Sequence, residues 1–246
     1  TQTGIIHALA SGVDIVEVDI VPCQDGWIAS HDIRLSVSTE AGGLTTEKTE
    51  DEIREIRVKL ANGEASEEHL LTLSDVLAIA ASHGNGADHD GYLVKLDIKF
   101  SNQELEDRLV DTILTSGIPL TKILMTCGFA NISQRIATLC PELPFELNTV
   151  EPTMFLTQYE LMDQELMPEV FLSYVRSFAR LTNAKVVSMM HFAMQKWGDT
   201  VTRKLLAGIA KMGLDSQVWV VGSLRDYKKY GEIGATYALM HNPKLI

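Results

Sequence analysis

Apolar and polar positions divide the chain into alternating strand-like and helix-like segments. Residues 13–21 form a nearly continuous β-branched run, which is typical of a strand buried on both faces. The sequence Gln24-Asp25-Gly26 then predicts a turn, and residues 27–30 predict a short second strand that ends in His31-Asp32. Further strands are expected at residues 92–100, 122–126, 145–150, 184–190, 217–221 and 236–240.

Helical periodicity fills most of the intervals between these strands. A capping box at residues 49–52 predicts a helix over residues 49–60, and similar starts predict helices over 72–82 and after 101–104. The remaining helices are expected at residues 3–10, 131–139, 157–181 with interruptions, 200–212 and 223–230. Residues 35–46, 61–69 and 83–90 are polar and predict loops.

This alternation of strand and helix is the pattern of parallel βαβ units. Seven or eight strands in 246 residues predict an α/β protein with a (β/α)8 TIM barrel, and a doubly wound open sheet is the second choice. Apolar residues make up 46 % of the chain, which is enough for a sizeable core. No compositional break divides it, so we expect a single domain over residues 1–246.

Two carboxylates interrupt the first apolar strand. Glu17 and Asp19 are two residues apart, so both side chains project from the same face of the strand. Adjacent buried carboxylates are costly unless a positive group lies against them, and a hard divalent cation with oxygen ligands is a good candidate. The sequence therefore predicts a cation site on this strand.

A second group of charges lies on the strand expected at residues 92–100. Asp97 and Lys99 share one face near the end of that strand, and active sites of barrels lie at the C-terminal ends of their strands. His31 also ends a strand and is placed for acid–base chemistry. Three carboxylates around one ion, beside a lysine, would bind a phosphate.

Each of these signals also has an ordinary structural explanation. A lone Glu-x-Asp in a strand is usually solvated or salt-bridged, a His-Asp pair is usually a surface turn, and Lys95, Asp97 and Lys99 could form the polar face of an edge strand. Their order and their placement at strand ends favour a common site. Among the other histidines, His191 follows a strand and is a reserve candidate.

Charge and composition limit the partners. A net charge of −12 argues against nucleic acid or an anionic membrane surface. No apolar run is long enough to span a bilayer, three cysteines predict no disulfide framework, and no motif fixes an oligomeric state. The first residues are no signal peptide, which favours the cytoplasm, although a processed periplasmic or secreted protein would begin in the same way.

The motifs together resemble the glycerophosphodiester phosphodiesterase family, whose members are barrels of the phospholipase C-like phosphodiesterase type. The resemblance rests on Glu17-Val18-Asp19, the turn at Gly26, the His31-Asp32 strand end and Leu96-Asp97-Ile98-Lys99. A helix start at Leu71-Thr72-Leu73 and a late strand with Trp219 also match. The resemblance is specific over residues 1–100 and weak over residues 120–215.

The resemblance implies the roles of individual residues. Glu17, Asp19 and Asp97 would hold one divalent cation, Ca²⁺ or Mg²⁺; His31 would be a catalytic histidine, and Lys99 and Trp219 would bind substrate. The implied activity is metal-dependent hydrolysis of a small phosphodiester, in which a neighbouring hydroxyl attacks phosphorus and water then opens the cyclic phosphate. The implied setting is lipid metabolism.

Three features depart from the family pattern. Asp97 stands where Glu is usual, and Val37 stands where Arg is common. The family's first strand, which ends in His-Arg-Gly and supplies a second catalytic histidine, is absent before Thr1. Since a barrel without its first strand would expose strand edges, we expect the natural protein to extend upstream with such a strand.

Two other functions compete with this one. A degenerate barrel of the same family would bind phosphorylated ligands without catalysis. A glycosidase-type barrel hydrolase would use Glu17 and Asp97 as its carboxylate pair and would need no metal.

Overall fold

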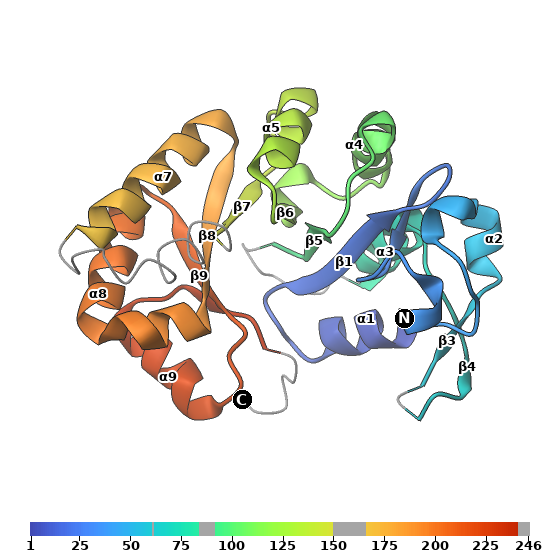
Figure 1. The fold of residues 1–246 in the computed structure, drawn as a ribbon, viewed down its shortest axis with the longest axis horizontal. Coiled ribbons are helices and arrows are strands. Elements are labelled where there is room, and N and C mark those ends of the chain that lie inside the picture. Colours follow the sequence, from blue (N-terminus) through green and yellow to red (C-terminus); the bar gives the residue numbers. More distant parts are fainter. Residues whose placement is uncertain (61, 84–91, 150–165, 241–246) are drawn as a thin grey trace. The chain divides into compact units, whose positions relative to one another are not determined.

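A computed structural model describes residues 1–60, 62–83, 92–149 and 166–240 (Figure 1). They form two compact units, each described here by itself. The first consists of Thr1–Met125 with Thr138–Leu143, and the second of Thr126–Ala137 with Pro144–Ile246. No helix within the described residues combines the length and the apolar character needed to cross a bilayer.

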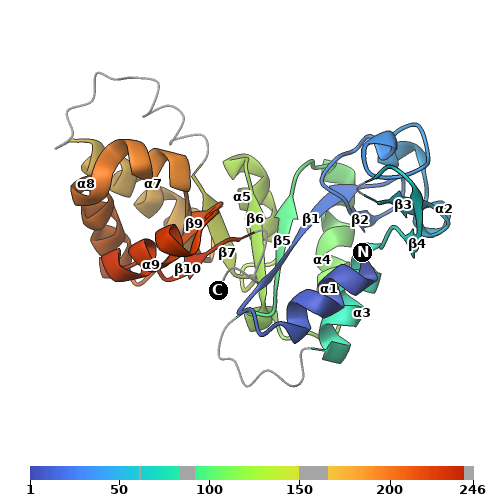
Figure 2. The same cartoon turned by 90° about the horizontal axis from the view of Figure 1, so that it is seen from below.

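The first unit is built on the strand that carries the two carboxylates. β1 (Val16–Pro22) pairs antiparallel with β2 (Trp27–Ala29) and parallel with β5 (Val94–Ile98). The β-branched residues of β1 are buried, as expected for a strand with a neighbour on each side. Helices α1 (Gln2–Ala10) and α3 (Leu73–His83) lie side by side in this unit, and α4 (Glu106–Thr115) follows β5 (Figure 2).

A small subdomain between β2 and α3 differs from the prediction. The expected helix over 49–60 ends early, as α2 (Glu50–Arg54), and β3 (Arg57–Lys59) follows it. β3 pairs antiparallel with β4 (Ala65–His69), within the segment predicted as a loop. The β4 residues are polar and largely solvent-accessible, so strand pairing forms this hairpin without the apolar pattern that usually marks a strand.

The second unit repeats the parallel strand and helix pattern. Its strands β7 (Phe145–Asn148), β8 (Ala184–Met190), β9 (Asp215–Trp219) and β10 (Tyr237–Ala238) lie side by side in chain order. β6 (Ile123–Cys127) runs from the first unit into the second. The helices of this unit are α5 (Ala130–Leu139), α7 (Met167–Leu181), α8 (His191–Lys211) and α9 (Leu224–Ile233), and Phe171, Leu205 and Val218 lie in its core.

Most predicted elements of the second unit are present with shifted ends. α8 begins at His191 instead of residue 200, and Gly198, with φ of 77°, interrupts its helical backbone. Positive φ favours glycine, so this kink separates two helical pieces. The predicted helix over 157–181 is described only from Met167. The predicted loop over 83–90 begins with His83, which instead ends α3, and its other residues lie outside the described residues. The alternation of strand and helix confirms the α/β class.

Candidate active site

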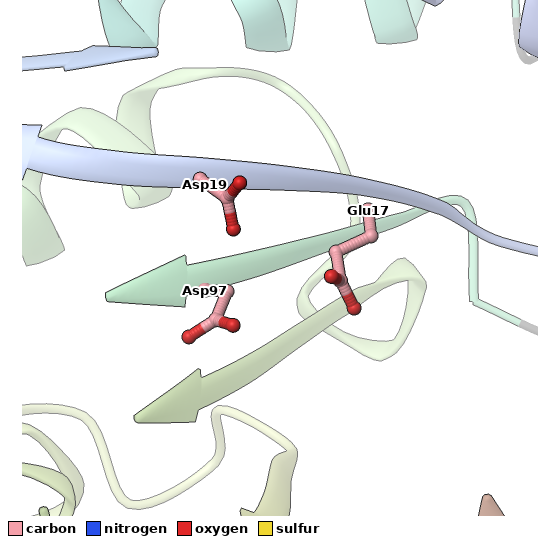
Figure 3. A group of neighbouring side chains, drawn as sticks. All are labelled: Glu17, Asp19 and Asp97. Atoms are coloured by element: carbon pink, nitrogen blue, oxygen red, sulfur yellow. The ribbon is translucent and has the colours of Figure 1, made fainter. Parts of the chain in front are cut away.

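The parallel register of β1 and β5 brings the predicted carboxylates together. Glu17 lies opposite Lys95, and Asp19 lies opposite Asp97. Since alternate residues of a strand share a face, the three acidic side chains project from the same side of the two strands (Figure 3). One oxygen from each carboxylate lies within 4.8 Å of the other two. That spacing suits three ligands of one cation.

Lys99 lies against two of these carboxylates. Its Nζ is 2.6 Å from Asp97 Oδ2 and 3.0 Å from Asp19 Oδ1. The contact with Asp97 is a hydrogen bond, whereas the contact with Asp19 is close but lacks hydrogen-bond geometry. Asp19 Oδ1 is therefore a buried oxygen that accepts no hydrogen bond from the described residues. The charge of Asp19 is met by the Lys99 ammonium through the ion pair, and Oδ1 has no further donor among the described residues.

The environment of the cluster shifts two pKa values. Burial raises the pKa of Asp97, and the charges of Glu17 and Asp19 add to the rise, while Lys99 acts in the opposite direction. Burial disfavours the Lys99 ammonium, but its hydrogen bond to Asp97 and the nearby carboxylate charges outweigh that effect and raise the pKa of Lys99 to about 12. Lys99 therefore stays positively charged at neutral pH.

Lys95 is part of the cluster, although the sequence analysis gave it no role beyond a polar strand face. Its ammonium forms an ion pair with Glu17, and its side chain is only 3 % exposed. The sequence signal was present, because Lys95 shares the two-residue spacing of Asp97 and Lys99. The sequence alone does not show that Lys95 pairs with Glu17 on the neighbouring strand.

His31 follows β2 on the turn at residues 30–32. The backbone N–H of Ser30 donates to the carbonyl of Asp19 at 3.0 Å, and Ser30 Oγ donates to the carbonyl of Asp32 at 2.8 Å. The first bond attaches the turn to the middle of β1, and the second lies within the turn. The His31 side chain is 67 % exposed, and its Nδ1 lies 3.5 Å from Asp32 Oδ2. His31 is thus at the strand edge and accessible, outside the group of three carboxylates.

Trp219 and His191 lie in the second unit. Trp219 ends β9, and its indole N–H is buried without a hydrogen-bond partner among the described residues. His191 Nδ1 lies 2.8 Å from the Tyr230 hydroxyl, and its Nε2 lies 4.0 Å from Asp226 Oδ2. Burial, followed by nearby carboxylate charge, raises the pKa of Tyr230 to about 12. The contacts of His191 with α9 give it a role in joining α8 to α9.

Comparison with known proteins identifies the family of this chain. A sequence profile of the Glycerophosphoryl diester phosphodiesterase family matches residues 1–244. The chain belongs to this family. Membership makes the protein a phosphoric diester hydrolase of the glycerophosphodiester phosphodiesterase type, as the motifs predicted, and removes the ground for the glycosidase alternative. A search of curated proteins finds no significant match.

Solved structures support the same fold. A protein from Silicibacter pomeroyi, assigned as a glycerophosphoryl diester phosphodiesterase, is 20 % identical, with a TM-score of 0.72 over 98 % of this chain and 84 % of its own. A phosphodiesterase from Oleispira antarctica, solved with the product sn-glycerol-3-phosphate, is 15 % identical, with a TM-score of 0.71 over 98 % and 86 %. A glycerophosphodiester phosphodiesterase from Parabacteroides distasonis is also 15 % identical, with a TM-score of 0.70 over 99 % and 86 %. The likeness confirms the predicted TIM-barrel type of fold.

Proposed function

We propose that this phosphodiesterase hydrolyses a glycerophosphodiester to glycerol phosphate and an alcohol, with a divalent cation held by Glu17, Asp19 and Asp97. The observation that carries the proposal is the convergence of three carboxylate oxygens within 4.8 Å on two neighbouring strands. The buried Asp19 Oδ1, which lies beside the Lys99 ammonium and accepts no hydrogen bond within the described residues, is an oxygen donor of the kind such a cation prefers.

The donor set fits Ca²⁺ or Mg²⁺. Both ions prefer oxygen ligands, and three carboxylates leave coordination positions for water and substrate. When bound, such a cation neutralises phosphate charge and polarises the phosphorus centre. The strands hold the carboxylates in place before any ion binds, since each belongs to the β1–β5 ladder.

The other predicted residues complete the reaction. The exposed imidazole of His31 exchanges a proton with either the attacking hydroxyl or the leaving alkoxide. Lys99 donates to a phosphate oxygen, and its high pKa keeps the ammonium charged throughout. The role of Trp219, in the second unit, as a substrate contact stays a prediction from the family resemblance. A hydroxyl beside the diester attacks phosphorus and loses its proton, the alcohol leaves with a proton, and water opens the cyclic phosphate.

The experiment that tests this function combines chelation with one pair of variants. The wild-type chain, dialysed against chelator, is assayed on glycerophosphocholine with and without added Ca²⁺ or Mg²⁺. We expect activity to disappear on chelation and to return with one of the two ions. Asp97→Asn should abolish both activity and stoichiometric metal, whereas Asp215→Asn, a half-buried strand carboxylate of the second unit, should keep both. Full activity without metal would contradict the proposal.

A further inference from the structure

Five charged side chains lie on one face of β1 and β5, and their signs alternate along β5 but not along β1. Glu17 faces Lys95, Asp19 faces Asp97, and Lys99 follows immediately after β5. The two ammonium groups offset two of the three carboxylate charges in this group. They differ in exposure, because the Lys99 side chain is 26 % exposed and the Lys95 side chain 3 %. Lys99 can thus meet a ligand from solvent, whereas Lys95 lies inside.

A lysine this deeply buried needs a reason. Lysine is almost never fully buried unless paired, and a buried ion pair is often no more stable than an apolar pair of similar size. Val94 and Leu96, the buried neighbours of Lys95 on β5, point to the opposite face, and Lys95 shares its own face with Asp97. A buried ion pair with Glu17 offers no clear gain in stability, so the positive charge beside that carboxylate points to an effect on the ligands of the site.

We propose that Lys95 is a positioning residue that sets the charge balance of the site: it weakens binding of the divalent cation and strengthens binding of the anionic phosphate. This inference rests on the proposed cation site and extends it to a residue that touches neither ligand. Lys95 acts through Glu17, because its ammonium occupies one side of the carboxylate that the cation would share.

The Lys95 ammonium affects the affinity for the cation in two opposite ways. Lys95 restricts the Glu17 side chain, which helps a ligand that needs a fixed carboxylate. It also repels a doubly charged ion bound to the same carboxylate, and this repulsion is strong where water is excluded. β1 already places Glu17 beside Asp19 and Asp97. We therefore expect the repulsion between Lys95 and the cation to change cation affinity more than the restriction of Glu17 by Lys95 does.

The Lys95 charge changes the affinity for phosphate in one direction only. A phosphodiester or phosphate ligand is an anion, so each positive charge near the cluster stabilises it. Removing the Lys95 charge should therefore tighten cation binding and loosen anion binding in the same protein. A merely structural defect would weaken both, so the opposite changes distinguish the two roles.

The test measures both affinities by calorimetric titration. Wild type and Lys95→Met are titrated first with Ca²⁺ or Mg²⁺ alone and then, with that ion saturating, with inorganic phosphate. We expect Lys95→Met to bind the cation about tenfold tighter, or about 1.4 kcal/mol, and phosphate several-fold more weakly. Lys185→Met, which replaces an exposed lysine on β8, is the matched control and should change neither affinity.

Each result decides the proposal. Weaker binding of both ligands by Lys95→Met, or no change in either, overturns it. If Lys95→Met fails to fold, Lys95→Gln gives the same comparison with a polar, neutral side chain, and wild type provides a further check. In wild type, linkage requires the cation to change phosphate affinity by the same factor as phosphate changes cation affinity, so titrations in both orders check the measured constants. A wild-type chain that binds no cation contradicts the proposed metal site itself.

Discussion

The proposed chemistry rests on single side chains, and strands place those of alternate residues on one face. The backbone of Glu17, Asp19 and Asp97 is fixed by the β1–β5 ladder, whereas His31 lies on a turn bonded to the middle of β1. The carboxylates are thus rigidly placed before any ligand arrives. His31 has room to move between positions of a reacting group. Substitutions at these two kinds of residue should therefore have different consequences.

Replacing His31 with alanine should lower kcat without affecting the fold. General acid–base groups contribute about 10²–10⁴-fold to rate, so a loss in that range is expected. Because the side chain is exposed, the free energy of unfolding should change by no more than about 0.5 kcal/mol. Steady-state kinetics and thermal unfolding measure the two effects. His7→Ala, at an exposed position of α1, is the control, and a near-normal kcat in His31→Ala would remove His31 from the mechanism.

Lengthening Asp97 to glutamate should be tolerated. Asp97→Glu keeps the carboxylate and restores the residue usual in the family, so the variant should retain the cation and a measurable fraction of wild-type kcat. Asp97→Asn keeps the size of the side chain but removes its charge, and should lose the cation. Metal analysis and kinetics on both variants check this pair. Equal loss in both would show that the site requires the shorter side chain itself.

At the scale of elements, the start of α3 is fixed by a small charged network. Asp75 accepts hydrogen bonds from the Thr72 backbone and hydroxyl, at 3.0 and 2.7 Å, and Arg54 Nε lies 3.1 Å from Asp75 Oδ2. Burial opposes the charged form, but the bonds from Thr72 and the Arg54 guanidinium outweigh it and lower the pKa of Asp75. The network connects α2 to the first turn of α3.

This network predicts a pH-dependent stability. Since the folded pKa of Asp75 lies below its unfolded value of about 3.9, its contribution is present above that pH and is lost as the pH falls through the folded pKa. Asp75→Asn should lower stability at pH 7 by about 1 kcal/mol, the usual worth of a helix cap.

Thermal unfolding from pH 7 to pH 3 measures the effect. The difference in Tm between wild type and Asp75→Asn should begin to shrink below about pH 4, where Asp75 of the unfolded chain takes up a proton, and should disappear only below the lower folded pKa. Asp51→Asn is the matched control, since Asp51 contacts the same Arg54 but its side chain is 97 % exposed. It should change stability by no more than about 0.5 kcal/mol at any pH. A constant difference between wild type and Asp75→Asn would assign the effect to packing.

At the scale of the whole molecule, each unit has a core of its own. Phe171 and Leu205 lie in the core of the second unit, whereas Val21, Ile28 and Ile53 pack together in the first. The three carboxylates belong wholly to the first unit, on β1 and β5. A bound cation therefore acts directly on the stability of that unit.

Adding the cation should stabilise the protein against heat. A ligand at 100 times its Kd contributes about 2.7 kcal/mol, or about 5–10 °C in Tm for a chain of this size. Hydrogen exchange should slow most on β1 and β5, the strands that carry the ligands. Glu17→Gln should lose most of this stabilisation, while Asp215→Asn should keep it. Equal protection of β8 and β9, with none on β1, would place the cation elsewhere.

The sequence by itself determined the local features of this protein. The β-branched run around Glu17 and Asp19 specified a buried strand with both carboxylates on one face, because side chains alternate along any strand. The alternation of strand and helix specified the α/β class, since each element must bury its apolar face against the next. The position of Asp97 and Lys99 near a strand end was equally local.

Only the tertiary structure decided which residues face each other. The register that places Glu17 opposite Lys95 and Asp19 opposite Asp97 depends on pairing between strands about 80 residues apart, which no local pattern encodes. The same holds for the β3–β4 hairpin, whose polar residues form strands because they pair with each other. A lone lysine in a strand looks like a polar face in the sequence. Burial beside a carboxylate makes Lys95 part of the site, and burial is a property of the fold.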